Sequence, residues 1–195
     1  MAVRPKTLDR RAEILQAARA VFAEKGLEAA KISEIVARAG VAQGTFYLYF
    51  PSKTSLVEAL ASEAYGAILD SLKAASVGKA TYAERLEAMI RAAFAAGRGF
   101  DDVNAILQMG VALVERPADW QRYLEPFDQF LTEFVRQGMA AGELEPSLNP
   151  ERTARLLFLT VNAAIDECFT FHPEQDPEMF VLETVGFVQR ALLKR

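Results

Sequence analysis

Apolar residues recur at helical spacing along nearly the whole chain, and no stretch alternates in the way a half-buried β-strand does. Ile14, Ala18, Val21 and Phe22, for example, share one face of a predicted helix that Gly26 is expected to end. The 195 residues are 51% hydrophobic, which is enough for one ordinary domain or for two small ones that share a core. The sequence therefore predicts an all-α protein with about nine helices.

Glycines, prolines and N-capping residues set the expected ends of these helices. We expect Gly97 and Gly99 to follow the end of the fifth helix, and Pro126 is a candidate interruption of the seventh. Asn149 and Asp176, each followed by proline and glutamate, are expected to cap the last two helices. The predicted helices cover approximately residues 7–25, 32–39, 42–50, 53–74, 82–96, 101–114, 117–139, 149–171 and 176–193.

Charge is distributed unevenly between the two ends of the chain. The first 53 residues carry nine Lys or Arg and five Asp or Glu, whereas the other 142 residues carry 13 and 21. The net charge of −4 hides this difference. Such asymmetry suggests a segment that binds a polyanion joined to a segment that does not.

The composition argues against several classes of protein. A single cysteine, Cys168, cannot form an internal disulfide, and a single histidine, His172, leaves little for a metal site, so both are expected to be structural or exposed. The chain has no phosphate loop, nucleophile elbow or carboxylate pair in a recognised motif, so we expect no enzyme, no metal and no cofactor. No apolar run reaches membrane length and no signal peptide is apparent, so we expect a cytoplasmic protein without a membrane partner.

The most informative stretch is residues 32–53, where two short predicted helices flank Gly40 and Val41. This arrangement matches a helix-turn-helix, whose second helix enters the major groove of DNA. Gln can pair with adenine, and Thr and Tyr hydroxyls suit phosphate oxygens, although the tyrosines could also be merely solvated. Lys53 places a cation in the first turn of the next helix, where the helix dipole favours an anion, so we expect it to face a phosphate. The outer side of the second short helix carries Gln43, Gly44, Thr45, Tyr47, Leu48 and Tyr49.

Residues 40–53, with the sequence GVAQGTFYLYFPSK, and the preceding residues 35–39 resemble the DNA-binding signature of the TetR family of bacterial transcriptional regulators. Residues 14–18 and 22–26 resemble the first helix of that family, so the likeness covers roughly residues 10–60. The resemblance implies base reading by Gln43, assisted by Gly44 and Ser33, and phosphate contacts from Thr45, Tyr47, Tyr49 and Lys53.

Two positions depart from the family pattern. Ala30 and Lys31 stand where a Thr or Ser commonly caps the second helix, a loss that costs about 1 kcal/mol, although Lys31 could contact a phosphate instead. Ala42 replaces a frequent serine, which removes a cap at the third helix.

The resemblance implies that residues 1–53 form the DNA-binding domain and that residues 54–195 bind a small hydrophobic effector and dimerise. A helix over residues 53–74 is expected to connect the two domains. Asn162 and Asp166, four residues apart in an apolar helix, either orient a polar or cationic part of the effector or form a paired polar stripe at a subunit interface or helix contact. The preferred pocket walls, for which core packing is the alternative, are Met109, Trp120, Tyr123 and Phe127.

The last two predicted helices are the expected dimer interface, and the resemblance implies that they form a four-helix bundle with their symmetry mates. A two-fold dimer would bind a pseudo-palindromic operator in double-stranded DNA. The favoured hypothesis is a repressor that the effector releases from this operator; the alternative is a DNA-binding dimer whose C-terminal domain binds a protein partner. The apolar sets expected to be exposed are Leu156, Leu159 and Ala163 on one helix and Phe180, Val181, Val185, Val188 and Leu192 on the other.

Overall fold

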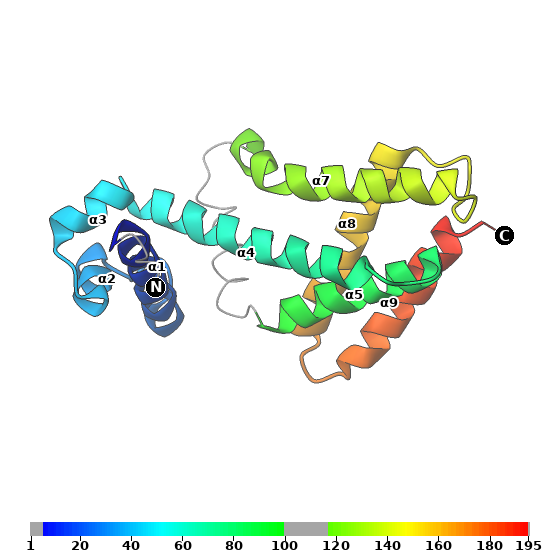
Figure 1. Cartoon of the computed structure of the whole chain (residues 1–195). Helices are drawn as coiled ribbons and strands as arrows, with labels where there is room; N and C mark the ends of the chain where they lie inside the picture. The colour runs from blue at the N-terminus through cyan, green and yellow to red at the C-terminus, as the bar shows by residue number, and fades with distance from the viewer. Residues whose placement is uncertain (1–5, 100–116, 195) are drawn as a thin grey trace. The chain divides into compact units, whose positions relative to one another are not determined.

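The computed structural model describes residues 6–99 and 117–194, with side chains from residues 10–98 and 124–194. Within these ranges the chain is helical apart from loops and one isolated antiparallel bridge between Leu144 and Leu193 (Figure 1). The all-α prediction is confirmed, and the predicted helix over residues 101–114 lies outside the described residues. The described elements are α1 (Lys6–Lys25), α2 (Ile32–Ala39), α3 (Gln43–Tyr49), α4 (Lys53–Ser76), α5 (Tyr82–Gly99), α7 (Pro117–Ala140), α8 (Pro150–Asp166), the π-helical segment η1 (Glu167–Phe171) and α9 (Pro177–Leu192).

The chain divides into two compact units. Of the described residues, unit 1 takes 6–65 and 117–120, with α1, α2, α3, the first half of α4 and the first residues of α7. Unit 2 takes residues 66–99 and 121–194, with the rest of α4, α5, most of α7, α8, η1 and α9. None of the described helices combines the length and the apolar character needed to cross a membrane.

Unit 1 has a small helical core, to which α1, α2, α3 and the start of α4 all contribute buried side chains. Phe46 of α3 is fully buried, and its ring centroid lies 5.7 Å from that of Phe50. Gly40 adopts φ 65° and ends α2, because a left-handed residue there lets Val41 donate its N–H back to the carbonyl oxygen of Val36 at 3.1 Å. Phe50 is extended, because the ring of Pro51 disfavours a helical conformation at the residue before it, and this ends α3.

In unit 2, α5 packs against α8 and α9. Two positions where the sequence predicted that a helix would end or be interrupted lie inside continuous helices. The α5 helix runs through Gly97 to Gly99, so the prediction that it ends at residue 96 was wrong. The reason is close packing: a Cβ at Gly97 would lie 2.7 Å from Cγ2 of Ile165 on α8. Pro126 lies inside a continuous α7 and does not interrupt it.

The caps predicted for the last two helices are confirmed. Asn149 Oδ1 accepts a hydrogen bond from the Arg152 N–H at 2.9 Å, and Asp176 Oδ1 accepts one from the Glu178 N–H at 3.0 Å. The helix predicted to run to Phe171 does so, but its last five residues are the π-helical segment η1.

The exposed apolar face of α9 differs from the predicted one. Its predicted members Val181, Val185, Val188 and Leu192 are buried inside unit 2, so that prediction was wrong. Both faces of α9 carry apolar residues, and helical spacing alone does not say which face packs on the protomer's own core. The large apolar side chains that α9 does expose are Met179, Leu182 and Phe187.

Candidate nucleic-acid interface

The α3 helix presents a polar and open face because its apolar side is buried in unit 1. Gln43 and Gly44 are exposed at the start of the helix, and Tyr47 is exposed one turn later. Thr45 is half-buried, and Tyr49 is half-buried with its side chain packed against the unit 1 core. The predicted base-reading positions therefore lie on the outside of the unit.

The start of α2 is built without the usual capping side chain, as the sequence predicts. Lys31 occupies the N-cap position, and its side chain has no acceptor atom. Glu34 compensates, because its carboxylate accepts the Lys31 N–H at 3.1 Å and the Lys25 ammonium at 2.7 Å. The hydrogen bond from Lys25, followed by that from the Lys31 backbone, lowers the pKa of Glu34. Lys31 and Ser33 are both exposed at the surface.

Lys53 has partners that the sequence did not indicate. Its ammonium donates hydrogen bonds to the carbonyl oxygens of Ala30 at 2.7 Å and Glu28 at 3.3 Å, both in the loop between α1 and α2. Burial lowers the pKa of this half-buried ammonium, and its nitrogen lies 6.0 Å from the centroid of the Phe22 ring. An ammonium carries three N–H donors, so one remains for a phosphate oxygen.

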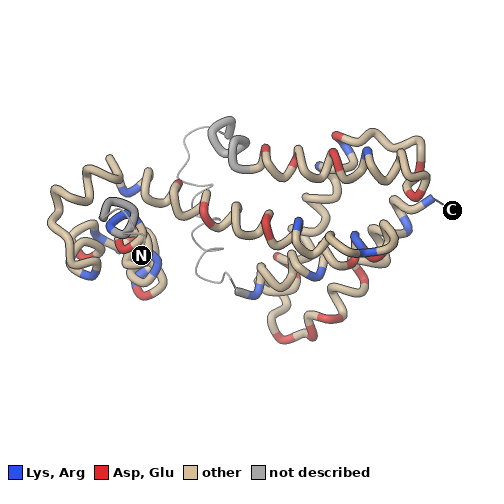
Figure 2. Tube along the Cα trace, in the orientation of Figure 1, with Lys and Arg blue, Asp and Glu red and all other residues tan. Residues whose placement is uncertain are grey.

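Most of the positive charge in unit 1 is neutralised by nearby carboxylates, and both signs are seen along its helices in Figure 2. Among the basic residues whose side chains the structure describes there, Lys31 and Lys53 are the two without an ion pair. Both are predicted phosphate contacts. The paired cations are Arg10 with Glu13, Arg11 and Arg19 with Glu63, Lys25 with Glu34, and Arg38 with Glu24.

Sequence reasoning placed Leu48 on the outer side of this helix but assigned it no role. Its side chain is 83% exposed, more than any other large apolar side chain in the described ranges. The available signal was its position, four residues after Gly44 on an outward row of a helix whose inner row is Phe46 and Phe50.

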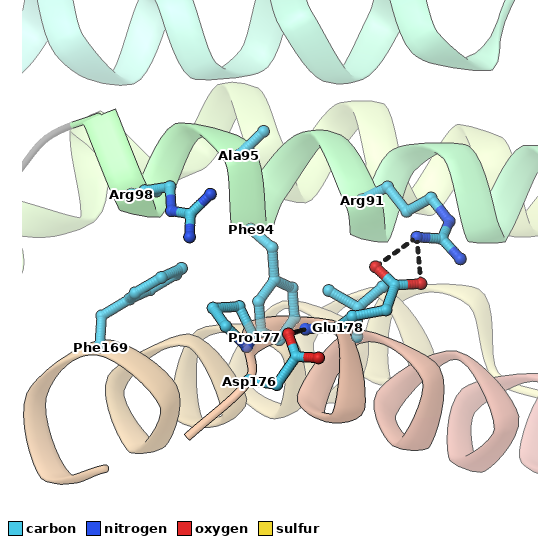
Figure 3. Close-up of a pocket in the computed structure, with 9 residues that line it drawn as sticks. Arg91, Phe94, Ala95, Arg98, Phe169, Asp176, Pro177 and Glu178 are labelled. Carbon is cyan, nitrogen blue, oxygen red and sulfur yellow. Dashed lines mark hydrogen bonds and ion pairs between the residues drawn. The ribbon is translucent and has the colours of Figure 1, made fainter. Parts of the chain in front are cut away.

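Unit 2 contains a pocket of about 240 Å³ between α5, η1 and the start of α9 (Figure 3). Arg91 forms a two-pronged ion pair with Glu178, at 2.9 and 3.0 Å, and also pairs with Glu87 at 2.8 Å. Arg98 has no ion pair among the described residues and lies with Phe169 at the other end of the pocket (Figure 3). The lining residues are Arg91, Phe94, Ala95, Arg98, Phe169, Asp176, Pro177, Glu178 and Val181.

None of the predicted effector contacts lines this pocket. Met109 lies outside the described residues, and Trp120 and Tyr123 lie on α7 in the part whose side chains are not described. Phe127 is buried, with its ring centroid 5.6 Å from that of Phe158. Effector binding by these residues stays a prediction.

Asn162 and Asp166 differ in exposure within the protomer. Asn162 is exposed, and its amide donates to the carbonyl oxygen of Phe158 in its own helix at 2.8 Å. Asp166 is half-buried, and desolvation, together with the nearby charge of Glu167, raises its pKa.

Two family models together cover most of the chain. Residues 14–60 match the model described as bacterial regulatory proteins, tetR family, and residues 86–192 match the one described as Tetracyclin repressor-like, C-terminal domain. The chain belongs to the TetR family of bacterial regulatory proteins. The resemblance seen in residues 10–60 is therefore confirmed, and the second match extends it to residues 86–192.

Individual TetR-family relatives agree with this assignment. The chain is 33% identical to the uncharacterized HTH-type transcriptional regulator YvdT of Bacillus subtilis, over 92% of this chain and 93% of that protein. Two solved structures share its fold. FadR from Bacillus subtilis in complex with stearoyl-CoA has a TM-score of 0.79 at 23% identity, covering 91% of this chain and 96% of its own. The SmeT–triclosan complex has a TM-score of 0.74 at 21% identity, covering 95% and 92%.

Proposed function

We propose that this TetR-family regulator is a homodimeric repressor that binds a pseudo-palindromic operator through α3 and leaves it when a small hydrophobic molecule binds in the C-terminal part. In this proposal residues 1–53 bind DNA, residues 54–195 bind the effector and dimerise, and the protein acts in the cytoplasm, where operator DNA lies. The observation that carries it is the outward face of α3, together with Lys31 and Lys53, the two cations of unit 1 that have no ion pair among its described side chains.

Different residues of this surface are proposed to read bases and to contact phosphates. Gln43 is exposed and can pair bidentately with adenine in the major groove, while Gly44 beside it lets the helix approach the base edges. Lys31 and the remaining N–H of Lys53 are positioned to contact phosphates without reading sequence, and Ser33, Thr45, Tyr47 and Tyr49 are proposed to assist.

A hydrophobic effector is supported by the ligands of the two fold neighbours, stearoyl-CoA and triclosan, both of which carry large apolar parts. An effector releases the operator only if it binds the DNA-incompatible conformation more tightly, with a coupling of about 1–3 kcal/mol. We propose Met109, Trp120, Tyr123 and Phe127 as its apolar contacts.

A homodimer through α8 and α9 is supported by the large apolar side chains that these helices expose, with Leu156 65% and Phe187 57% exposed. Asn162 follows the exposed Leu159 by three residues and is itself exposed, which favours a place at this interface over a contact with the effector. The alternative, a DNA-binding dimer whose C-terminal domain binds a protein partner, requires an exposed apolar patch on that domain in place of an enclosed pocket.

The test is selection of bound duplexes from a random pool with the full-length protein, followed by a screen of lipophilic molecules for release of the selected duplex. We expect a pseudo-palindromic site, a two-chain complex by sedimentation, and release by at least one lipophile. A random pool without enrichment would contradict the DNA-binding proposal. Enrichment by a two-chain complex that no lipophile displaces would favour the alternative.

Salt dependence tests the two lysines separately. Lys31→Ala and Lys53→Ala should each reduce the slope of log affinity against log salt by about one, because each variant binds one phosphate fewer, while Gln43→Ala should relax base preference instead. Lys79→Ala, which removes an exposed cation of unit 2, is the matched control and should leave the slope unchanged. If both lysine variants keep the salt slope of the unmodified protein, neither lysine contacts a phosphate at the interface.

A further inference from the structure

Leu48 is an exposed apolar residue that does not contribute to the core of unit 1. The side chain is 83% exposed, so the fold of the unit gains little from an apolar residue at this position. The neighbouring aromatic residues Phe46 and Phe50 are buried and hold α3 on the core. Leu48 is therefore free of a role in holding unit 1 together.

The surface beside Leu48 is open. Residues four apart on a helix lie on one row, which places Gly44 next to Leu48 and Gln43 next to Tyr47. A Cβ on Gly44 would meet no atom of the protein within 4 Å. The row of Gly44 and Leu48 is thus apolar and unobstructed, whereas the adjacent row of Gln43 and Tyr47 carries the hydrogen-bonding groups.

We infer that Leu48 contacts the 5-methyl group of a thymine in the operator and is a specificity-determining residue, an inference that rests on the DNA binding proposed above. A leucine side chain has no donor or acceptor for a phosphate or for the polar edge of a base. The thymine methyl is the apolar group that a base pair displays in the major groove, and aliphatic side chains select it by contact.

The position of this thymine follows from helix geometry. Leu48 comes five residues after Gln43, which is about 7.5 Å along a helix axis. Successive base pairs are about 3.4 Å apart. The contacted thymine is therefore expected about two base pairs from the base that Gln43 reads, once in each half-site.

A uracil scan of the selected operator tests the inference. Each thymine is replaced singly by uracil, which removes only the methyl group, and the affinity of the full-length protein is measured by fluorescence anisotropy. The unmodified protein should lose about fourfold in affinity at one thymine per half-site, the value of one buried methyl-sized group. Leu48→Ala should bind the thymine operator more weakly and show no further loss at that uracil.

Val77→Ala is the matched control, because Val77 is also an exposed apolar side chain, at 74%, but lies in the loop after α4. It should keep the uracil profile of the unmodified protein. Tight operator binding without sensitivity to any uracil, or equal sensitivity in Leu48→Ala, would overturn the role of Leu48 and leave the proposed function standing. A protein that selects no duplex would overturn both.

Discussion

Among the described residues, unit 1 exposes two large apolar side chains, Tyr47 and Leu48, and both lie on α3. Unit 2 exposes seven, six of them on α8, η1 and α9, and these are Leu156, Leu159, Phe171, Met179, Leu182 and Phe187. The seventh is Val77, in the loop after α4, and the other large apolar side chains described in both units are buried or half-buried. Each unit thus leaves apolar surface exposed on one set of helices, but the size of that surface differs. In unit 1 it is narrow and suits a DNA groove, whereas in unit 2 it is broad and suits another pair of helices.

The largest effect is expected from the buried side of α3. Phe46→Ala should lower the free energy of unfolding of unit 1 by about 3–5 kcal/mol, because it removes a fully buried ring from a small core. Leu48→Ala on the same helix is the control and should change the free energy of unfolding little, because Leu48 is exposed. Hydrogen exchange resolved by peptide would measure both, and loss of protection in α5, α8 and α9 together with α3 would contradict the separation into two units.

The exposed surface of unit 2 can be tested by charge. Leu156→Glu combined with Phe187→Glu should convert the dimer into a folded monomer, because both side chains are exposed in the protomer but would be buried between subunits. Operator affinity should then fall by about 100-fold, since two half-sites are no longer bound together. Sedimentation velocity and anisotropy measure the two effects, with Val77→Glu as the control. A double variant that stays dimeric would place the interface elsewhere.

Two helical glycines of unit 2 should respond to alanine with opposite signs. Gly97→Ala forces a methyl against Ile165 and should destabilise the unit by about 1–3 kcal/mol. At Gly66 in α4 a Cβ would meet no atom within 4 Å, so Gly66→Ala should stabilise the helix by about 0.5–1 kcal/mol. Thermal unfolding of both variants checks the pair, and stabilisation by Gly97→Ala would mean that α5 and α8 are not packed so closely.

The smallest effect concerns the start of α2 and depends on pH. Hydrogen bonds from Lys25 and from the Lys31 backbone lower the folded-state pKa of Glu34 below its usual 4.5. The stabilisation by its carboxylate is therefore complete above pH 4.5 and is lost as the pH falls through the folded-state pKa. Glu34→Gln should melt at a lower temperature than the unmodified protein at about pH 6, with the gap narrowing towards about pH 3. A gap that is constant with pH would exclude the carboxylate as its cause.

Unit 1 was predictable almost residue by residue, and unit 2 was not. The end of α2 agrees with the prediction because Gly40 sets it locally, through a left-handed conformation that glycine adopts without strain. In α5 the same residue type misled, because Gly97 serves close packing against α8 and not the end of a helix. The sequence alone does not show whether a glycine is present for its backbone conformational freedom, as Gly40 is, or for its small size, as Gly97 is.

The candidate site divides along the same line. The outward position of Gln43, Gly44 and Tyr47 followed from helical spacing, since buried Phe46 fixes the opposite face. The carbonyl partners of Lys53 did not, because they belong to backbone atoms 23 and 25 residues away in the sequence. The exposure of Asn162 was equally out of reach, because an amide in an apolar helix can face a core, an interface or water.

By itself, the sequence determined the helical class, the caps of α8 and α9 and the helix-turn-helix with its outward residues. These features rest on interactions within a few residues, such as the hydrogen bond from Arg152 to Asn149. Only the tertiary structure decided which face of α9 is buried, why α5 continues through Gly97 and what the ammonium of Lys53 binds. Those outcomes depend on atoms that are distant along the chain and become neighbours only when the helices pack.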